Sequence, residues 1–177
     1  MIPEIRGLDT ETGDPKYARL ELERRWLVDK AARPALDGAF MTLIEDRYLD
    51  GTRMRLRKMS RPDLDETKCK LTKKYETERP EARPIVTSYL TEAEHALFAG
   101  LPAHPLRKTR YHMLFDSHWW SLDAFEGALA GLELIEVEVS DEAALAALVP
   151  PPWATKEVTH DPRYQCGALA QSNAIPE

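Results

Sequence analysis

Alternation of charged and apolar side chains is the main pattern of this chain, and it predicts a protein built largely of β-strands. The run at 20–28 (LELERRWLV), if extended, places Glu21, Glu23 and Arg25 on one face and mostly apolar side chains on the other. Four later runs repeat this arrangement. We therefore predict a sheet in which many strands carry one charged face.

Turn and capping signals divide the chain into elements. Asp50-Gly51 is typical of a hairpin turn, and Thr91-Glu92-Ala93-Glu94 has the pattern of a capping box at a helix start. The predicted strands cover roughly 18–28, 40–49, 52–59, 67–75, 85–90, 106–115, 119–125 and 134–139. Short helices are predicted at 91–100, 141–148 and within 153–170, with a helix or turn at 29–36.

Hairpin connections between most strands indicate an α+β fold with an antiparallel sheet. Charged faces on so many strands cannot all face solvent while every apolar face packs into one sandwich core. A barrel with a polar, hydrated interior and an apolar exterior partly covered by helices satisfies both demands. The 177 residues suit one domain, which we place at 18–170, with 1–17 and 171–177 as tails.

Composition limits the possible partners. The net charge of −6 argues against nucleic acid, whereas basic residues concentrate at 53–74 and 107–110, which favours a small polyanion. No signal sequence or run of transmembrane length is evident, so we predict a cytoplasmic protein without a membrane partner. Cys69 and Cys166 lack metal-ligand spacing, and we expect both to be structural.

Opposite charges fall on different strands. Arg53, Arg55 and Arg57 share one face of a strand, and such a surface repels itself unless acids or an anion neutralise it. Carboxylates suit Mg²⁺, and arginine and lysine suit phosphate oxygens, so both together indicate a polyphosphate site. The carboxylates are Glu21, Glu23, Glu136 and Glu138. The candidate phosphate ligands are Arg53, Arg55, Arg57, Lys70, Lys74, Arg79, Lys108 and Arg110.

Other classes of enzyme lack their motifs. The chain has no HExxH, GxxxxGK[ST], GxGxxG or GxSxG sequence, which argues against a zinc hydrolase, a P-loop or dinucleotide fold and an α/β-hydrolase. Trp119 and Trp120 are interpreted first as wall residues of a hairpin, with base stacking as the alternative.

The motif Glu21-Leu22-Glu23-Arg24-Arg25 resembles the ExExK signature of the CYTH superfamily, the triphosphate tunnel metalloenzymes. The similarity covers roughly 20–170 in the family's order. It continues through Arg55-Leu56-Arg57, Leu71-Thr72-Lys73-Lys74, Arg79 with Glu81, Lys108-Thr109-Arg110-Tyr111, Leu122-Asp123-Ala124-Phe125, Glu136-Val137-Glu138, Pro151-Pro152-Trp153 and 157–164.

This resemblance implies an antiparallel eight-stranded β-barrel tunnel that binds triphosphates with Mg²⁺ or Mn²⁺. The four glutamates would hold metal. Phosphate would be held by Arg55, Arg57, Lys74, Lys108 and Arg110, with Arg53 as a further candidate. The implied reaction is hydrolysis of inorganic tripolyphosphate by attack of a metal-activated water on a terminal phosphoryl group. Arg25 replaces the family lysine, and a guanidinium cannot lose a proton at neutral pH. We therefore predict that Arg25 orients phosphate and stabilises charge, and that Tyr48 orients the water.

Related functions remain open at this stage. A nucleoside or thiamine triphosphatase, an adenylate cyclase and a non-catalytic polyphosphate- or phosphopeptide-binding module would all suit such a site. The expected partner is tripolyphosphate or a nucleoside triphosphate, and the expected assembly is a monomer or homodimer.

Overall fold

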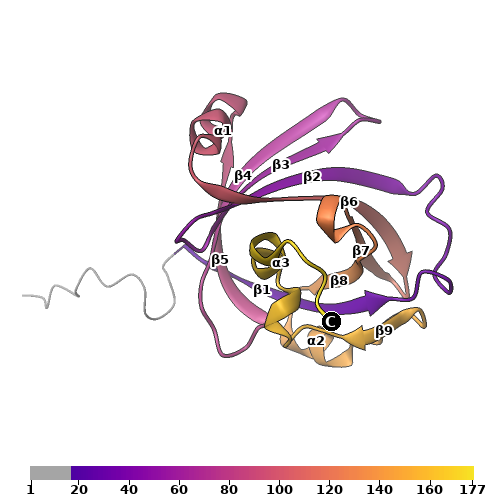
Figure 1. Cartoon of the computed structure of the whole chain (residues 1–177). Helices are drawn as coiled ribbons and strands as arrows, with labels where there is room; N and C mark the ends of the chain where they lie inside the picture. The colour runs from indigo at the N-terminus through magenta and orange to yellow at the C-terminus, as the bar shows by residue number, and fades with distance from the viewer. Residues whose placement is uncertain (1–16) are drawn as a thin grey trace, which may run out of the picture.

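A closed antiparallel barrel dominates the computed structural model, which describes residues 17–177 (Figure 1). The strand order β5-β4-β3-β2-β6-β7-β8-β1 is closed by pairing of β1 with β5, which confirms the predicted α+β fold and eight-stranded barrel. The strands are β1 (Arg19–Val28), β2 (Phe40–Leu49), β3 (Met54–Arg61), β4 (Glu66–Lys74), β5 (Ala82–Leu90), β6 (Ala103–Phe115), β7 (His118–Phe125), β8 (Glu133–Val139) and β9 (Ala154–Glu157).

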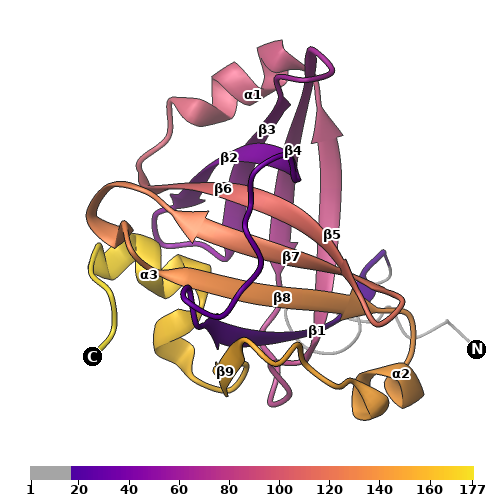
Figure 2. The same ribbon diagram turned by 90° about the vertical axis from the view of Figure 1, so that its right-hand side faces the viewer.

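Short helices lie around this barrel. They are α1 (Glu92–Ala99), α2 (Glu142–Ala147) and α3 (Cys166–Ser172), with 3₁₀ turns η1 (Gly127–Leu129) and η2 (Pro162–Tyr164). The predicted capping box is present, because Thr91 and Glu94 bond each other's backbone N–H groups at the start of α1. Figure 2 shows α1 and α2 at opposite sides of the molecule, and Figure 1 shows α3 lying across one end of the barrel.

Strand β1 is the seam of the barrel. One edge pairs with β8 over Leu22–Leu27; the other edge pairs with β5 over Arg19–Leu22 and then with β9 at Trp26 and Val28. β9 therefore continues the wall where β5 ends. The prediction of only helices within 153–170 is wrong at β9, because a four-residue polar strand has no sequence signal of its own.

Apolar side chains pack on both sides of the barrel wall. On the outside, Trp26 of β1, Trp120 and Leu122 of β7 and Ile135 of β8 pack with residues of α2 and with Trp153. A second cluster, here called the plug core, joins inward-facing residues of β6, β7 and β8 to α3. It consists of Leu106, Phe125, Leu129, Leu132, Leu134, Val158, Tyr164, Leu169 and Ala170. The interior is thus charged along its middle and apolar where α3 closes one end.

Most element boundaries agree with the sequence. β2 matches its predicted range, and the 29–36 segment, predicted as a helix or turn, contains turns. The predicted tail at 1–17 lies outside the described residues except for Tyr17, and α3 runs to Ser172, past the predicted domain end at 170. None of the helices within 17–177 is long and apolar enough to cross a bilayer.

The outer core predicts a large effect of truncating Leu122. This side chain on β7 is fully buried, so Leu122→Ala should lower the free energy of unfolding by roughly 2–5 kcal/mol through lost burial and a new cavity. Urea denaturation measures this. Leu114→Ala on β6 is the control, because Leu114 is 63% exposed and its loss should cost under about 0.5 kcal/mol. Equal effects of the two variants would contradict the packing described.

Candidate active site

A cavity of about 310 Å³ lies inside the barrel, and ten basic and five acidic side chains within residues 17–177 line it. All the residues predicted for the site line it except Arg79. They come from β1, β2, β3, β4, β6 and β8 and from the turn before β3, because alternation on each strand directs every second side chain inward. The predicted strand faces therefore converge in one place.

Arg79 lies elsewhere. Its guanidinium pairs with Glu142 at 2.9 Å and with Glu81 at 3.0 Å in a groove on the outer surface next to α2. Arg79 is in the loop before β5 and not on an inward strand face, so the structure offers no support for its predicted phosphate role.

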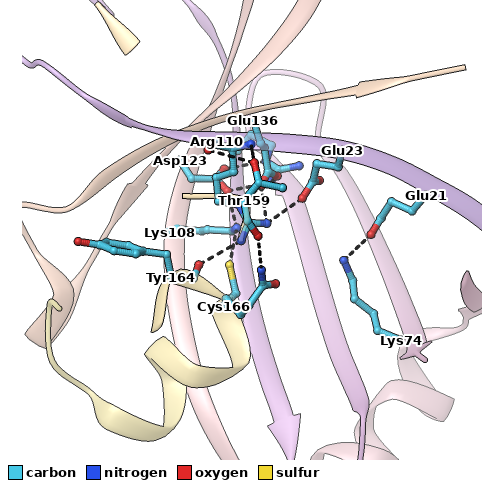
Figure 3. Close-up of polar contacts among 12 residues, drawn as sticks. Glu21, Glu23, Lys74, Lys108, Arg110, Asp123, Glu136, Thr159, Tyr164 and Cys166 are labelled. Carbon is cyan, nitrogen blue, oxygen red and sulfur yellow. Dashed lines mark hydrogen bonds and ion pairs between the residues drawn. The ribbon is translucent and has the colours of Figure 1, made fainter. Parts of the chain in front are cut away.

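A chain of ion pairs joins the buried carboxylates (Figure 3). Arg25 of β1 donates to Glu23 at 2.8 Å and to Glu136 of β8 at 3.1 Å. Glu136 also accepts from Arg110 of β6, which pairs with Asp123 of β7. The Arg25–Glu136 and Arg110–Asp123 pairs are direct cross-strand partners, so barrel register fixes them.

The remaining predicted metal ligands have separate cations. Glu21 accepts from Lys74 of β4 at 2.5 Å, and Glu138 pairs with Arg19 at 2.5 Å. Burial opposes ionisation of Glu21, but Lys74 holds the pKa of its carboxyl below the usual value. The side chain of Glu138 is 45% exposed, so this carboxylate lies at the rim.

Crowding of acidic groups is strongest at Glu23. Burial, and then the negative charge of Glu136, raise the pKa of Glu23 to about 7. Both carboxylates contact the same nitrogen of Arg25, at 2.8 and 2.9 Å. A further cation would relieve this repulsion, and carboxylate oxygens are what Mg²⁺ and Mn²⁺ prefer. Among residues 17–177, no three acidic, histidine or cysteine side chains lie close enough together to form a preformed metal site. The glutamates instead form ion pairs with arginine or lysine side chains.

The opposite wall carries excess positive charge. Arg57 of β3 forms a two-pronged pair with Asp46 of β2 at 2.6 and 2.7 Å. Arg55 reaches Asp46 only at 3.8 Å, and its buried Nε has no hydrogen-bond partner. Burial, followed by the charges of Arg57 and Arg55, lowers the pKa of Lys70. Repulsion among neighbouring cations and an unsatisfied buried donor both favour an anion in this part of the cavity.

Several cavity residues were missed by the sequence patterns. Gln165, Cys166 and Gln171 enter the cavity from α3 and the residue before it. Cys166 was expected to be structural, yet its sulfur lies 3.7 Å from Nζ of Lys108. Arg19 also lines the cavity, and its place two residues before Glu21 on an alternating strand was a usable signal.

Aromatic side chains are scarce in the cavity. Tyr48 of β2 is the one aromatic residue among those described that line it, and burial raises the pKa of its phenol well above the usual value. Tyr48 thus stays protonated at neutral pH. Trp120 is buried in the outer core against Trp26, with ring centroids 5.6 Å apart, and Trp119 is 61% exposed outside the cavity. The alternative that these tryptophans stack on a base in the site is therefore wrong, because neither of them lines the cavity.

The structure is a closed antiparallel barrel whose interior has carboxylates on one side and a basic wall on the other. This arrangement is typical of tunnel proteins that bind polyanions. Comparison with solved structures agrees with this class. The chain superposes on two crystal structures of the protein NE1496, one of which is described as an inorganic triphosphatase. For that structure the identity is 30%, the TM-score is 0.56, and 89% of this chain and 97% of the other are covered. The chain belongs to the CYTH superfamily of triphosphate tunnel metalloenzymes.

Sequence comparison finds two curated relatives, both named inorganic triphosphatase. The protein from Nitrosomonas europaea is 44% identical over 77 residues, or 43% of this chain, and that from Acetivibrio thermocellus is 41% identical over 59 residues, or 33%. These matches span only 51% and 36% of the relatives' lengths. No protein-family model matches the chain. A structure of the protein PH1819 from Pyrococcus horikoshii, at 18% identity and a TM-score of 0.53, shares the fold.

The buried pair of Asp46 with Arg57 predicts a pH-dependent contribution to stability. Burial would raise the pKa of Asp46, but Arg57 and Arg55 lower it from 3.8 to about 2. A lowered folded-state pKa stabilises the fold fully above about pH 4, and this stabilisation is lost as the pH falls towards 2.

We expect Asp46→Asn to lower the free energy of unfolding by roughly 3–5 kcal/mol at pH 6, because Arg57 stays buried without its partner. The difference from wild type should shrink by about 1 kcal/mol at pH 3. Urea denaturation at pH 6, 4 and 3 tests this, with Glu45→Gln on the outer face of β2 as control. A difference that is constant with pH would contradict the assignment.

Proposed function

We propose that this protein is a divalent-metal-dependent hydrolase of triphosphate compounds and that inorganic tripolyphosphate is its substrate. The observation that carries the proposal is the charge of the cavity inside the closed barrel, where ten basic side chains outnumber five acidic ones among the residues that the structure describes. A small, highly charged anion neutralises such a surface. Its kinship with proteins named inorganic triphosphatase supports the same substrate class.

We assign the binding of the phosphate groups to the basic wall of the cavity. Arg55 reaches Asp46 only at 3.8 Å and has a buried donor in need of an acceptor, and burial together with neighbouring cations lowers the pKa of Lys70. Arginine forks grip phosphate oxygens with two hydrogen bonds, and lysines act as point charges. Arg53, Lys74 and Arg57 extend this wall along β3, β4 and the turn before β3. These groups also neutralise the charge that develops as the terminal phosphoryl group is transferred.

We assign the binding of the metal, Mg²⁺ or Mn²⁺, to the carboxylates of β1 and β8. Glu21, Glu23, Glu136 and Glu138 supply oxygen ligands of the right chemistry, and the raised pKa of Glu23 reflects the need for another cation. When bound, the metal lowers the pKa of a ligated water and draws charge from phosphate oxygens. Arg25 stays charged, since Glu136 and Glu23 raise its pKa despite burial, so Arg25 cannot accept a proton.

Tyr48 is assigned a role in orienting the attacking water or a phosphate oxygen. Its O–H stays protonated, so it acts at neutral pH as a hydrogen-bond donor. It lies on β2 as the cross-strand partner of Arg55, which places it beside the proposed phosphate groups. The absence of a second aromatic side chain among the described lining residues favours inorganic tripolyphosphate over a nucleotide.

A substrate panel tests the function directly. With Mg²⁺ or Mn²⁺ we expect phosphate release from tripolyphosphate to exceed that from ATP in kcat/KM by at least about tenfold, because the cavity offers no stacking partner for a base beyond Tyr48. Removal of metal by EDTA should abolish turnover. Faster hydrolysis of ATP, formation of cyclic AMP, or tight binding of tripolyphosphate without turnover would each contradict the proposal.

The carboxylate assignment predicts a large loss in Glu23→Gln. This change keeps the shape of the side chain and removes its negative charge, so tripolyphosphate hydrolysis should fall at least about a hundredfold. Glu45→Gln is the matched control, since Glu45 lies on the outer face of β2 and pairs with Arg107 at 3.0 Å. Activity is measured as phosphate release at saturating metal. Equal rates for the two variants would refute a metal role for Glu23.

A further inference from the structure

Arg25 binds groups from three separate parts of the chain. Nε donates to Glu136 of β8 at 3.1 Å, Nη2 donates to Glu23 of β1 at 2.8 Å, and Nη1 donates to the carbonyl oxygen of Tyr164 at 3.1 Å. Every nitrogen of the guanidinium therefore has an acceptor within the protein. A guanidinium has five N–H groups in a fixed planar fork, so little donor capacity remains for water or phosphate.

The carbonyl of Tyr164 belongs to the segment that closes one end of the barrel. η2 ends at Tyr164, Gln165 follows, and α3 begins at Cys166 (Figure 1). Gln165, Cys166 and Gly167 line the cavity, whereas Leu169 on the same helix is fully buried in the plug core. The segment is therefore held by apolar packing on one side and by the hydrogen bond from Arg25 on the other.

Hydrogen bonds of the Arg25 backbone hold residues 158 and 159, which precede η2, next to β1. The N–H of Arg25 donates to Oγ1 of Thr159 at 2.9 Å, and the N–H of Val158 donates to the carbonyl of Arg25 at 2.8 Å. Gln165 in turn donates to the carbonyl of Thr159 at 3.3 Å. Residues 158–165 thus stay next to the carboxylate pair, as Figure 3 shows for Thr159, Tyr164, Glu23 and Glu136.

We propose that Arg25 is a positioning residue that couples the seating of α3 to the arrangement of Glu23 and Glu136. The C-terminal segment then sets the affinity of this carboxylate pair for a divalent cation. The inference rests on the proposed function, because it takes these carboxylates as the metal-binding side of the site. It revises the sequence prediction for Arg25, which acts here through its neighbours and not on phosphate.

A lysine at this position would break the coupling while keeping the charge. Its ammonium offers one nitrogen in place of three, so it cannot contact Glu23, Glu136 and the Tyr164 carbonyl with the spacing of a planar fork. Arg25→Lys therefore separates the loss of geometry from the loss of charge. Arg24→Lys is the matched control, because Arg24 is adjacent, faces outward and also pairs with a glutamate, Glu157, at 2.6 Å.

The first experiment measures two quantities in the full-length wild type and in both lysine variants. Mn²⁺ affinity is measured by calorimetry with the metal alone, and amide hydrogen exchange is followed in residues 164–172. In Arg25→Lys we expect Mn²⁺ binding to weaken by about tenfold to a hundredfold, as is usual when the partner of a metal ligand is lost. Exchange in 164–172 should become faster. Arg24→Lys should change neither quantity.

Unchanged exchange in Arg25→Lys overturns the link to α3, and faster exchange with wild-type Mn²⁺ affinity overturns the coupling. These results differ from failure of the proposed function, which would appear as no Mn²⁺ binding by the wild type. The exchange measurement needs no metal, so in that case it still accepts or rejects the contact between Arg25 and α3.

A second variant loosens the helix from its opposite side. Leu169 lies in the plug core and does not line the cavity, so Leu169→Ala disturbs α3 without replacing any residue that lines the cavity. We expect weaker Mn²⁺ binding, with an effect that does not add to that of Arg25→Lys. Leu169→Val provides a milder change if the alanine variant does not fold. Faster exchange in α3 with full Mn²⁺ affinity, or strict additivity, would refute the coupling.

Discussion

Neutralisation of charge inside the barrel is the constraint on which the rest of this structure depends. Among the described residues, ten basic side chains line one cavity, and like charges brought so close together repel one another. Two aspartates that lie behind the cavity surface reduce this repulsion. Asp46 holds Arg57, and Asp123 holds both Lys108 and Arg110. Because charged side chains occupy the middle of the barrel, the apolar residues pack outside the wall and at the end closed by α3.

The two aspartates also show where sequence patterns stop being informative. Alternation predicts which face a residue shares, and it correctly placed Glu21, Arg55 and Arg110 towards one interior. It does not predict which residue lies opposite on the next strand. The pairs Asp46–Arg57 and Arg110–Asp123 depend on the register between strands, which only the closed barrel defines. The site residues were therefore predictable as a set, but their partners were not.

Residues outside the regular strands were the hardest to predict. Arg79 was assigned to the site as one of the basic residues expected opposite the carboxylates, but it lies in a charged, proline-rich stretch where no periodicity indicates the direction of a side chain. Gln165 and Cys166 reach the cavity only because apolar residues further along α3 fill the barrel end. Strand β9 was missed because its four residues, three of them polar, become a strand only beside the free edge of β1. In each case tertiary contacts, and not local preference, decide the structure.

The seam at β1 has a consequence for how the protein folds. This strand pairs with β5, then with β8 and β9, so its partners lie between about 60 and 130 residues further along the chain. During synthesis Glu21 and Glu23 emerge before all of these partners, so one edge of β1 waits for β5 and the other edge waits for β8. Pairings this distant close slowly and leave a strand edge open to wrong partners. Glu21 and Glu23 are therefore synthesised before Glu136 and Glu138, and they reach their final surroundings only when β8 pairs with β1.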